Sequence, residues 1–156
     1  MIETTIPGYT ELKLKHLVMD YNGTLACDGM LLAGVKECLQ TLAGMLDIYV
    51  LTADTFGKAR SELKGIPSKL AILPQDKQEI GKLEYIEKLG LENVACIGNG
   101  RNDRLMLKAS ALGIAVILEE GVAVETLLSA DVVCTGIVSA LKLLTNPLRL
   151  TATLRS

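Results

Sequence analysis

Polar side chains follow three apolar runs that have the length of β-strands. They lie in DYNGTL, which begins at Asp20, in LTAD, which contains Thr52, and in GNGRND, which ends at Asp103. In an open parallel sheet, ligands bind outside the carboxyl ends of the strands. A lone Asp at a strand end is usually a turn former or a helix cap. Three such segments, with glycines that let backbone N–H groups approach an oxyanion, predict a shared site instead.

This set of residues suits phosphoryl transfer through an aspartyl intermediate. In that chemistry a carboxylate attacks phosphorus, while a hydroxyl, a lysine, backbone amides and a divalent cation hold the transferring group. Mg²⁺ prefers one or two carboxylates plus waters and substrate oxygens, and Asp20 with Asp103 fits that count. The expected lysine is Lys77, at the start of a predicted helix, with Lys82 as the reserve candidate.

Alternating elements predict the fold that would position these groups. The expected strands are residues 12–19, 47–51, 69–73, 94–97, 113–118 and 131–134, and the expected helices are residues 34–45, 55–63, 76–89, 102–110, 122–128 and 137–144. This order favours an α/β, doubly wound parallel sheet sandwiched by helices, as one domain over residues 1–156. Residues 2–6 and the Pro7-Gly8 turn predict a short antiparallel hairpin on the sheet edge. The tail, residues 146–156, fits an edge strand or an oligomer contact.

The composition of the chain argues against several classes of binding partner. The chain has 156 residues, 3% aromatic, with 16 Lys and Arg against 18 Asp and Glu, so no basic field or stacking platform predicts nucleic-acid binding. The longest charge-free apolar runs are about ten residues, half of a membrane-spanning helix. The first residues lack the blocks of a signal peptide, which favours a cytoplasmic location. Four scattered cysteines and one histidine predict neither disulfides nor a zinc site.

Four segments, in order, resemble the motifs of the haloacid dehalogenase superfamily. They are DYNGTL, LTAD, PQDK and GNGRND. The chain looks most like the soluble P-type ATPases, a group similar to the phosphorylation domain of heavy-metal P-type ATPases, and GIAV at Gly113 and ADVV at Ala130 extend the likeness. The resemblance runs from about residue 14 to residue 144.

The resemblance implies a role for each motif residue. Asp20 would be the nucleophile, with Asn22, Thr52 and Lys77 completing the catalytic set. Mg²⁺ would be held by Asp20, the main-chain carbonyl of Asn22, Asn99 and Asp103. The remaining implied contacts, to the substrate phosphate, come from Gly23, Thr52, Ala53, Lys77 and Asn102.

Motif spacing leaves no room for a cap domain or a nucleotide-binding insert. Only 32 positions separate Asp20 from Thr52, and 25 separate Thr52 from Lys77. The chain is therefore expected to be capless and not an ion pump. Its site would be open to a phosphorylated substrate, even a macromolecular one, or be closed by a neighbouring subunit in a homo-oligomer.

Two amides depart from the superfamily pattern. Phosphatases of the superfamily carry an Asp general acid where this chain has Asn22, and such help is worth roughly 10²–10⁴-fold. Their fourth motif begins GD, where this chain has Asn99, so weaker Mg²⁺ binding is expected. These changes leave two hypotheses. The first is a slow Mg²⁺-dependent phosphohydrolase with a longer-lived phosphoenzyme, and the second is a catalytically weakened relative that binds phosphate or a partner as a regulatory or structural subunit.

Two other motif readings are weaker. The segment after Ile97, with Glu119 about twenty residues further on, resembles a dinucleotide-binding fingerprint but lacks its third glycine. A response-regulator receiver domain also uses Asp, Thr and Lys, but its acceptor Asp would not follow the first strand in a DxxGTL loop.

Overall fold

Six parallel strands form the central sheet in the computed structural model, which describes residues 1–156. Their order is β10-β9-β8-β3-β6-β7, and their bounds are β3 His16–Met19, β6 Asp47–Thr52, β7 Lys69–Ile72, β8 Val94–Gly98, β9 Leu112–Val116 and β10 Val132–Cys134. Met19 pairs with Val50 on one side and with Ile97 on the other. The segments that follow β3, β6 and β8 therefore reach the same edge, which confirms the predicted doubly wound sheet.

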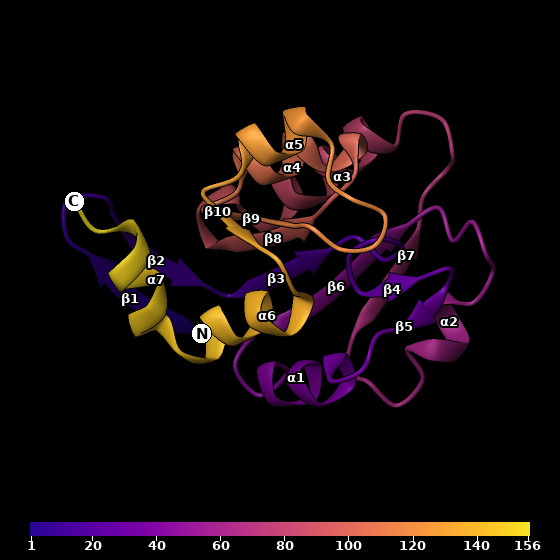
Figure 1. Ribbon diagram of the computed structural model, residues 1–156, viewed down its shortest axis with the longest axis horizontal. Coiled ribbons are helices and arrows are strands. Elements are labelled where there is room, and N and C mark those ends of the chain that lie inside the picture. Colours follow the sequence, from indigo (N-terminus) through magenta and orange to yellow (C-terminus); the bar gives the residue numbers. More distant parts are fainter.

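Helices cover both faces of this sheet (Figure 1). One face carries α3 (Gln78–Leu89), α4 (Arg104–Ala109) and α5 (Val124–Ser129), and the other carries α1 (Val35–Leu42) and α6 (Ile137–Thr145). Successive residues of β3 enter different cores, since Leu17 belongs to one buried cluster and Val18 to the other. This is the period of two that a strand buried on both faces requires.

The N-terminal hairpin stands apart from the sheet. Strands β1 (Ile2–Ile6) and β2 (Thr10–Leu14) form the predicted short antiparallel hairpin. They pair only with each other, so the expected place of this hairpin on the edge of the central sheet was wrong. The expected strand 12–19 is divided at Lys15, whose backbone N–H donates to Asn93 O (2.8 Å) and whose carbonyl accepts from Asp47 N (2.9 Å). The chain therefore leaves the β1–β2 hairpin at Lys15 before it enters the central sheet as β3.

The C-terminal tail is a helix and not an edge strand. Helix α7 (Pro147–Leu154) begins with a proline. Backbone N–H groups in the first turn of a helix have no acceptor within the helix, so the N–H that proline lacks costs no hydrogen bond there. It packs against the hairpin: Leu150 is fully buried, and Ser156 N donates to Pro7 O (3.2 Å). The hairpin and α7 occupy one end of the molecule in Figure 1.

Only small insertions interrupt the core at the other end. A two-residue strand pair, β4 (Ala26–Cys27) with β5 (Met30–Leu31), forms a flap after β3, and the short helix α2 (Ala59–Glu62) lies between β6 and β7. No cap domain is present between the motifs, as the spacing predicted.

No helix in the structure combines the length and the apolar character that crossing a membrane would need. Two 3₁₀ turns, η1 (Leu91–Asn93) and η2 (Arg101–Asp103), flank β8.

Candidate active site

A polar cavity of about 190 Å³ lies at the carboxyl ends of the central strands. It collects six of the residues expected at the site and four that the sequence reasoning did not name. The lining residues are Asp20, Asn22, Thr52, Ala53, Thr55, Gln78, Asn99, Gly100, Asn102 and Glu120. The fold therefore brings the first, second and fourth motifs together.

Lys82, the reserve candidate, forms an ion pair with Asp20. Its Nζ lies 2.8 Å from Asp20 Oδ1 and 2.6 Å from Asp103 Oδ1, and it donates to Asn102 Oδ1 at 3.0 Å. The Lys82 side chain is fully buried on the inner stripe of α3, between Gln78 and Ile86. The lysine that contacts Asp20 is therefore Lys82 and not Lys77.

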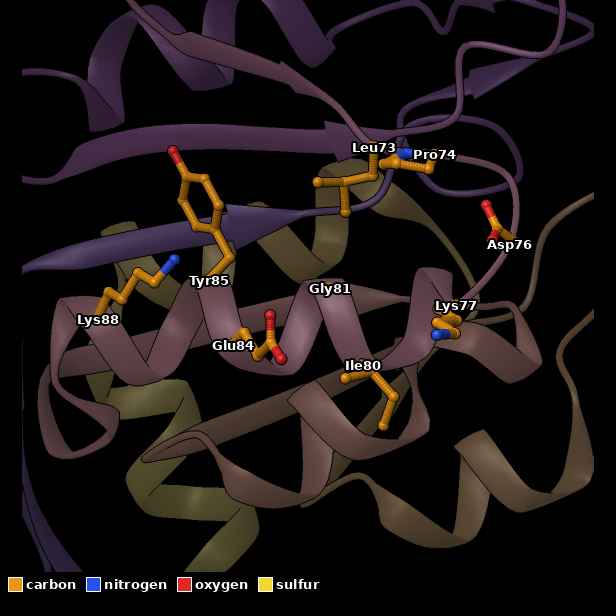
Figure 2. A pocket seen from close by; sticks show the side chains of 9 residues that line it. All are labelled: Leu73, Pro74, Asp76, Lys77, Ile80, Gly81, Glu84, Tyr85 and Lys88. Atoms are coloured by element: carbon orange, nitrogen blue, oxygen red, sulfur yellow. The ribbon is translucent and has the colours of Figure 1, made fainter.

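Lys77 lies elsewhere. It precedes α3 in the left-handed region, with φ 61°, and its side chain is exposed. Figure 2 shows it at the start of the helix, among the residues that line a different cavity of about 400 Å³. The third motif therefore lies outside the cavity lining, and the lysine that contacts Asp20 comes from the second turn of α3.

Burial and neighbouring charges together shift the pKa values of Asp20 and Lys82. Burial, followed by repulsion from Asp103, raises the pKa of Asp20 to about 7, against the opposing attraction of Lys82. Burial alone would lower the pKa of Lys82, but Asp20 and Asp103 together raise it above its ordinary value. Lys82 therefore remains an ammonium group, and it holds a carboxylate that is costly to keep charged.

Asp103 lies behind the cavity and does not line it. Its Oδ2 accepts from the backbone N–H groups of Asn99 (3.0 Å) and Gly100 (2.9 Å), while Oδ1 faces Lys82. Gly98 permits this approach, because a Cβ there would stand 2.5 Å from Asp103 Cγ. Three donors therefore contact this fully buried carboxylate, which anchors Lys82, and its implied role as a metal ligand stays a prediction.

Asn99 connects two loops beside Asp20. Its Oδ1 accepts from Thr24 Oγ1 (3.2 Å), and its Nδ2 donates to Gly121 O (3.1 Å). Gly23, at φ +79°, lies against this amide with no space for a side chain. Gly23 thus allows the loop that follows Asp20 to pack closely on Asn99.

Asn22 closes the turn of the flap. Its Oδ1 accepts from Gly29 N (3.1 Å), and the Tyr21 hydroxyl donates to Gly29 O (2.9 Å). The side chain at the expected general-acid position therefore has a structural partner, and it faces the cavity as well.

Thr52 is buried at the end of β6. Its Oγ1 accepts from Asp54 N (2.9 Å), and Asp54 Oδ1 accepts from Ala59 N (3.0 Å) at the start of α2. These contacts fix the hydroxyl of Thr52 and the backbone of Ala53 at the rim of the cavity.

The donor atoms at this edge fit a hard divalent cation. Asp20, Asn22 and Asn99 line the cavity and carry carboxylate, carbonyl and amide oxygens, which are ligands of the kind Mg²⁺ takes. The Asn99 amide oxygen keeps one lone pair beside the hydrogen bond that it accepts from Thr24. Glu120 adds a further carboxylate. The strand-end rule that selected the other residues points to Glu120 too, because it closely follows the run that forms β9.

Comparison with known proteins finds relatives of two kinds, and no family model matches the chain. The uncharacterized protein MJ0073 of Methanocaldococcus jannaschii is 48% identical over 82 residues, which cover 50% of this chain and 88% of the relative. The uncharacterized protein MJ0072 of the same organism is 49% identical over 39 residues, 25% of this chain and 89% of that protein.

Solved phosphatases share the fold at low identity. A 3-deoxy-D-manno-octulosonate 8-phosphate phosphatase from Moraxella catarrhalis, in complex with magnesium, phosphate and KDO, superposes with a TM-score of 0.70 at 21% identity, over 90% of this chain and 92% of that one. The cobalt-bound form of the deoxy-D-mannose-octulosonate 8-phosphate phosphatase YrbI from Haemophilus influenzae gives a TM-score of 0.70 at 17% identity, over 90% of both chains. A phosphoserine phosphatase in apo form gives 0.67 at 14% identity, over 85% of this chain and 98% of that chain. The chain therefore belongs to one family with MJ0073, and its fold is that of the haloacid dehalogenase superfamily.

Proposed function

We propose that this protein is a Mg²⁺-dependent phosphatase that works through a phosphorylated Asp20. The observation that carries the proposal is the contact of the buried Lys82 with Asp20 and Asp103, directly behind a cavity that Asp20 and Thr52 line. A carboxylate at a cavity wall, with its cation beside it, is suited to attack phosphorus. The phosphatases that share the fold support the proposal.

The protein residues have separate tasks in this reaction. Asp20 attacks phosphorus, and the bond between phosphorus and the leaving oxygen breaks, giving an acyl phosphate. The Thr52 hydroxyl holds a phosphoryl oxygen, and the Lys82 ammonium, which donates to Asp20, Asn102 and Asp103, offsets the phosphoryl charge from behind Asp20. Water then attacks phosphorus, releases inorganic phosphate and restores the Asp20 carboxylate.

A divalent cation would be held by Asp20, the Asn22 carbonyl and Asn99, where it would neutralise the phosphate charge. Asn22 itself cannot exchange a proton near neutral pH, so the leaving oxygen would take its proton from elsewhere, and turnover would be slow. Without a cap, the cavity stays open to a large phosphorylated substrate, or to cover by a second copy of the chain.

A panel of phosphoesters tests the proposal. Purified protein with Mg²⁺ is expected to release phosphate from at least one ester, and Asp20→Asn is expected to abolish the release. Asp76→Asn, an exposed carboxylate outside the cavity, is the matched control and should retain the wild-type rate. A wild type no faster than Asp20→Asn would refute the phosphatase and favour the regulatory or structural subunit.

A further inference from the structure

The loop between β9 and α5 brings a second carboxylate to the cavity. Glu120 lines it together with Asp20, and these two are the only carboxylates among the lining residues. Glu120 Oε2 lies 2.6 Å from the point where a Cβ of Gly23 would stand, on the side of the Asn99 amide. Glu120 forms no ion pair within the chain.

Asn99 holds this loop in place. Its Nδ2 donates to Gly121 O (3.1 Å), and its own main-chain carbonyl accepts from Ala123 N (2.9 Å). Thr24 Oγ1 donates to the amide oxygen and so fixes which way the amide faces. A carboxylate at position 99 could not donate to Gly121 O, because an ionised carboxylate only accepts hydrogen bonds. The amide at position 99 and the placement of Glu120 are therefore parts of the same arrangement.

The charges at this edge favour a cation beside Glu120. Lys82 and Asp103 neutralise one another, which leaves Asp20 with one negative charge, and Asn99 adds none. Glu120 brings the total to two, the number that balances a divalent ion. With the oxygens of Asn22 and Asn99, this is a set of hard ligands from three loops.

We infer that Glu120 is a ligand of the divalent cation and supplies, from the loop after β9, the carboxylate that position 99 lacks. The inference rests on the proposed function in that it places the cation of that reaction at this cavity. It assigns Glu120 to the cation, while Asn99 acts both as an amide ligand and as the anchor of the Glu120 loop.

Titration of the protein with Mn²⁺ alone tests the inference without a substrate. Binding is measured as the loss of the free Mn²⁺ signal in electron paramagnetic resonance. Mn²⁺ takes the same oxygen ligands as Mg²⁺. Glu120→Gln is expected to weaken Mn²⁺ binding by about tenfold or more, whereas Glu119→Gln should stay within about twofold of the wild type. Glu119 is the matched control, since it is the exposed neighbour on the same loop and does not line the cavity.

The outcomes separate this inference from the phosphatase proposal. Equal Mn²⁺ affinity in Glu120→Gln and Glu119→Gln would overturn it, as would a wild type that binds no Mn²⁺. A wild type that binds Mn²⁺ through Glu120 but releases phosphate from no ester would support the inference and refute the phosphatase. Thermal unfolding of each variant without metal confirms that the folds are intact, which the exposure of both glutamates leads us to expect.

Discussion

The two ends of the molecule are built from opposite kinds of side chain. At the amino end of β3, the hairpin and α7 bury aliphatic residues such as Ile6, Leu14 and Leu150. At its carboxyl end, the chain buries Lys82 and Asp103 and encloses most of Asp20. Apolar burial is favourable by itself, whereas a buried ion pair repays its desolvation only with good geometry. The first end is therefore expected to contribute stability, and the second to keep costly charges for chemistry.

Removing the buried cation should have the largest effect. Lys82→Met leaves Asp103 and Asp20 without their shared partner, and we expect a loss of about 3–5 kcal/mol in the free energy of unfolding, together with loss of phosphate release. Urea unfolding measures the first quantity. Lys77→Met, an exposed residue near the start of the same helix, should change stability by no more than about 0.5 kcal/mol. A stable Lys82→Met protein would contradict the account of the charged end.

The pH dependence of Asp20→Asn is the next largest effect. The folded protein binds the Asp20 proton with a pKa of about 7, above the unfolded value of about 4, so wild-type stability falls as pH rises through this range. The amide of the variant cannot titrate, and the stability of the variant relative to the wild type should therefore increase from pH 4 to pH 7, by at most about 4 kcal/mol. Melting temperatures of both proteins across this range measure the difference. A constant difference would show that Asp20 does not resist ionisation.

A substitution in the apolar core between α7 and the hairpin should change stability and leave activity and metal binding unchanged. Leu150→Ala removes a fully buried side chain between α7 and the hairpin, at an expected cost of about 3 kcal/mol. Phosphate release and Mn²⁺ affinity, measured under folding conditions, should stay at wild-type values. Leu148→Ala is the control, because Leu148 is 82% exposed on the same helix and its loss should cost no more than about 0.5 kcal/mol. A change in Mn²⁺ affinity in Leu150→Ala would show that the two ends are coupled.

The same contrast explains what the sequence could predict. The sheet was predictable because strands buried on both faces read as apolar runs, and the strand-end rule placed Asp20, Thr52 and Asn99 at one edge. Lys82 was only the reserve candidate because its stripe of α3 holds Gln78 and Ile86, so a polar residue facing the core breaks the usual apolar period. The separate hairpin depends on hydrogen bonds of Lys15 to two other segments, which no local pattern reveals.

The smallest effect concerns Asn22, at the end of the molecule that holds Asp20, Lys82 and Asp103, where the proposed reaction could use a general acid. Asn22→Asp keeps an acceptor for Gly29 N, so the flap should stay closed while the cavity gains a group that can exchange protons. We expect turnover to rise by about tenfold, equivalent to about 1.4 kcal/mol in the barrier. Steady-state phosphate release measures this gain, and acid-quenched phosphoenzyme should fall as release accelerates. Asn146→Asp, an exposed amide at the apolar end, should leave both unchanged. If Asn22→Asp loses phosphoenzyme without gaining turnover, the limiting step is phosphorylation or a step before it, and the proposed metal ligands around Asn99 become the place where the charged end sets the rate.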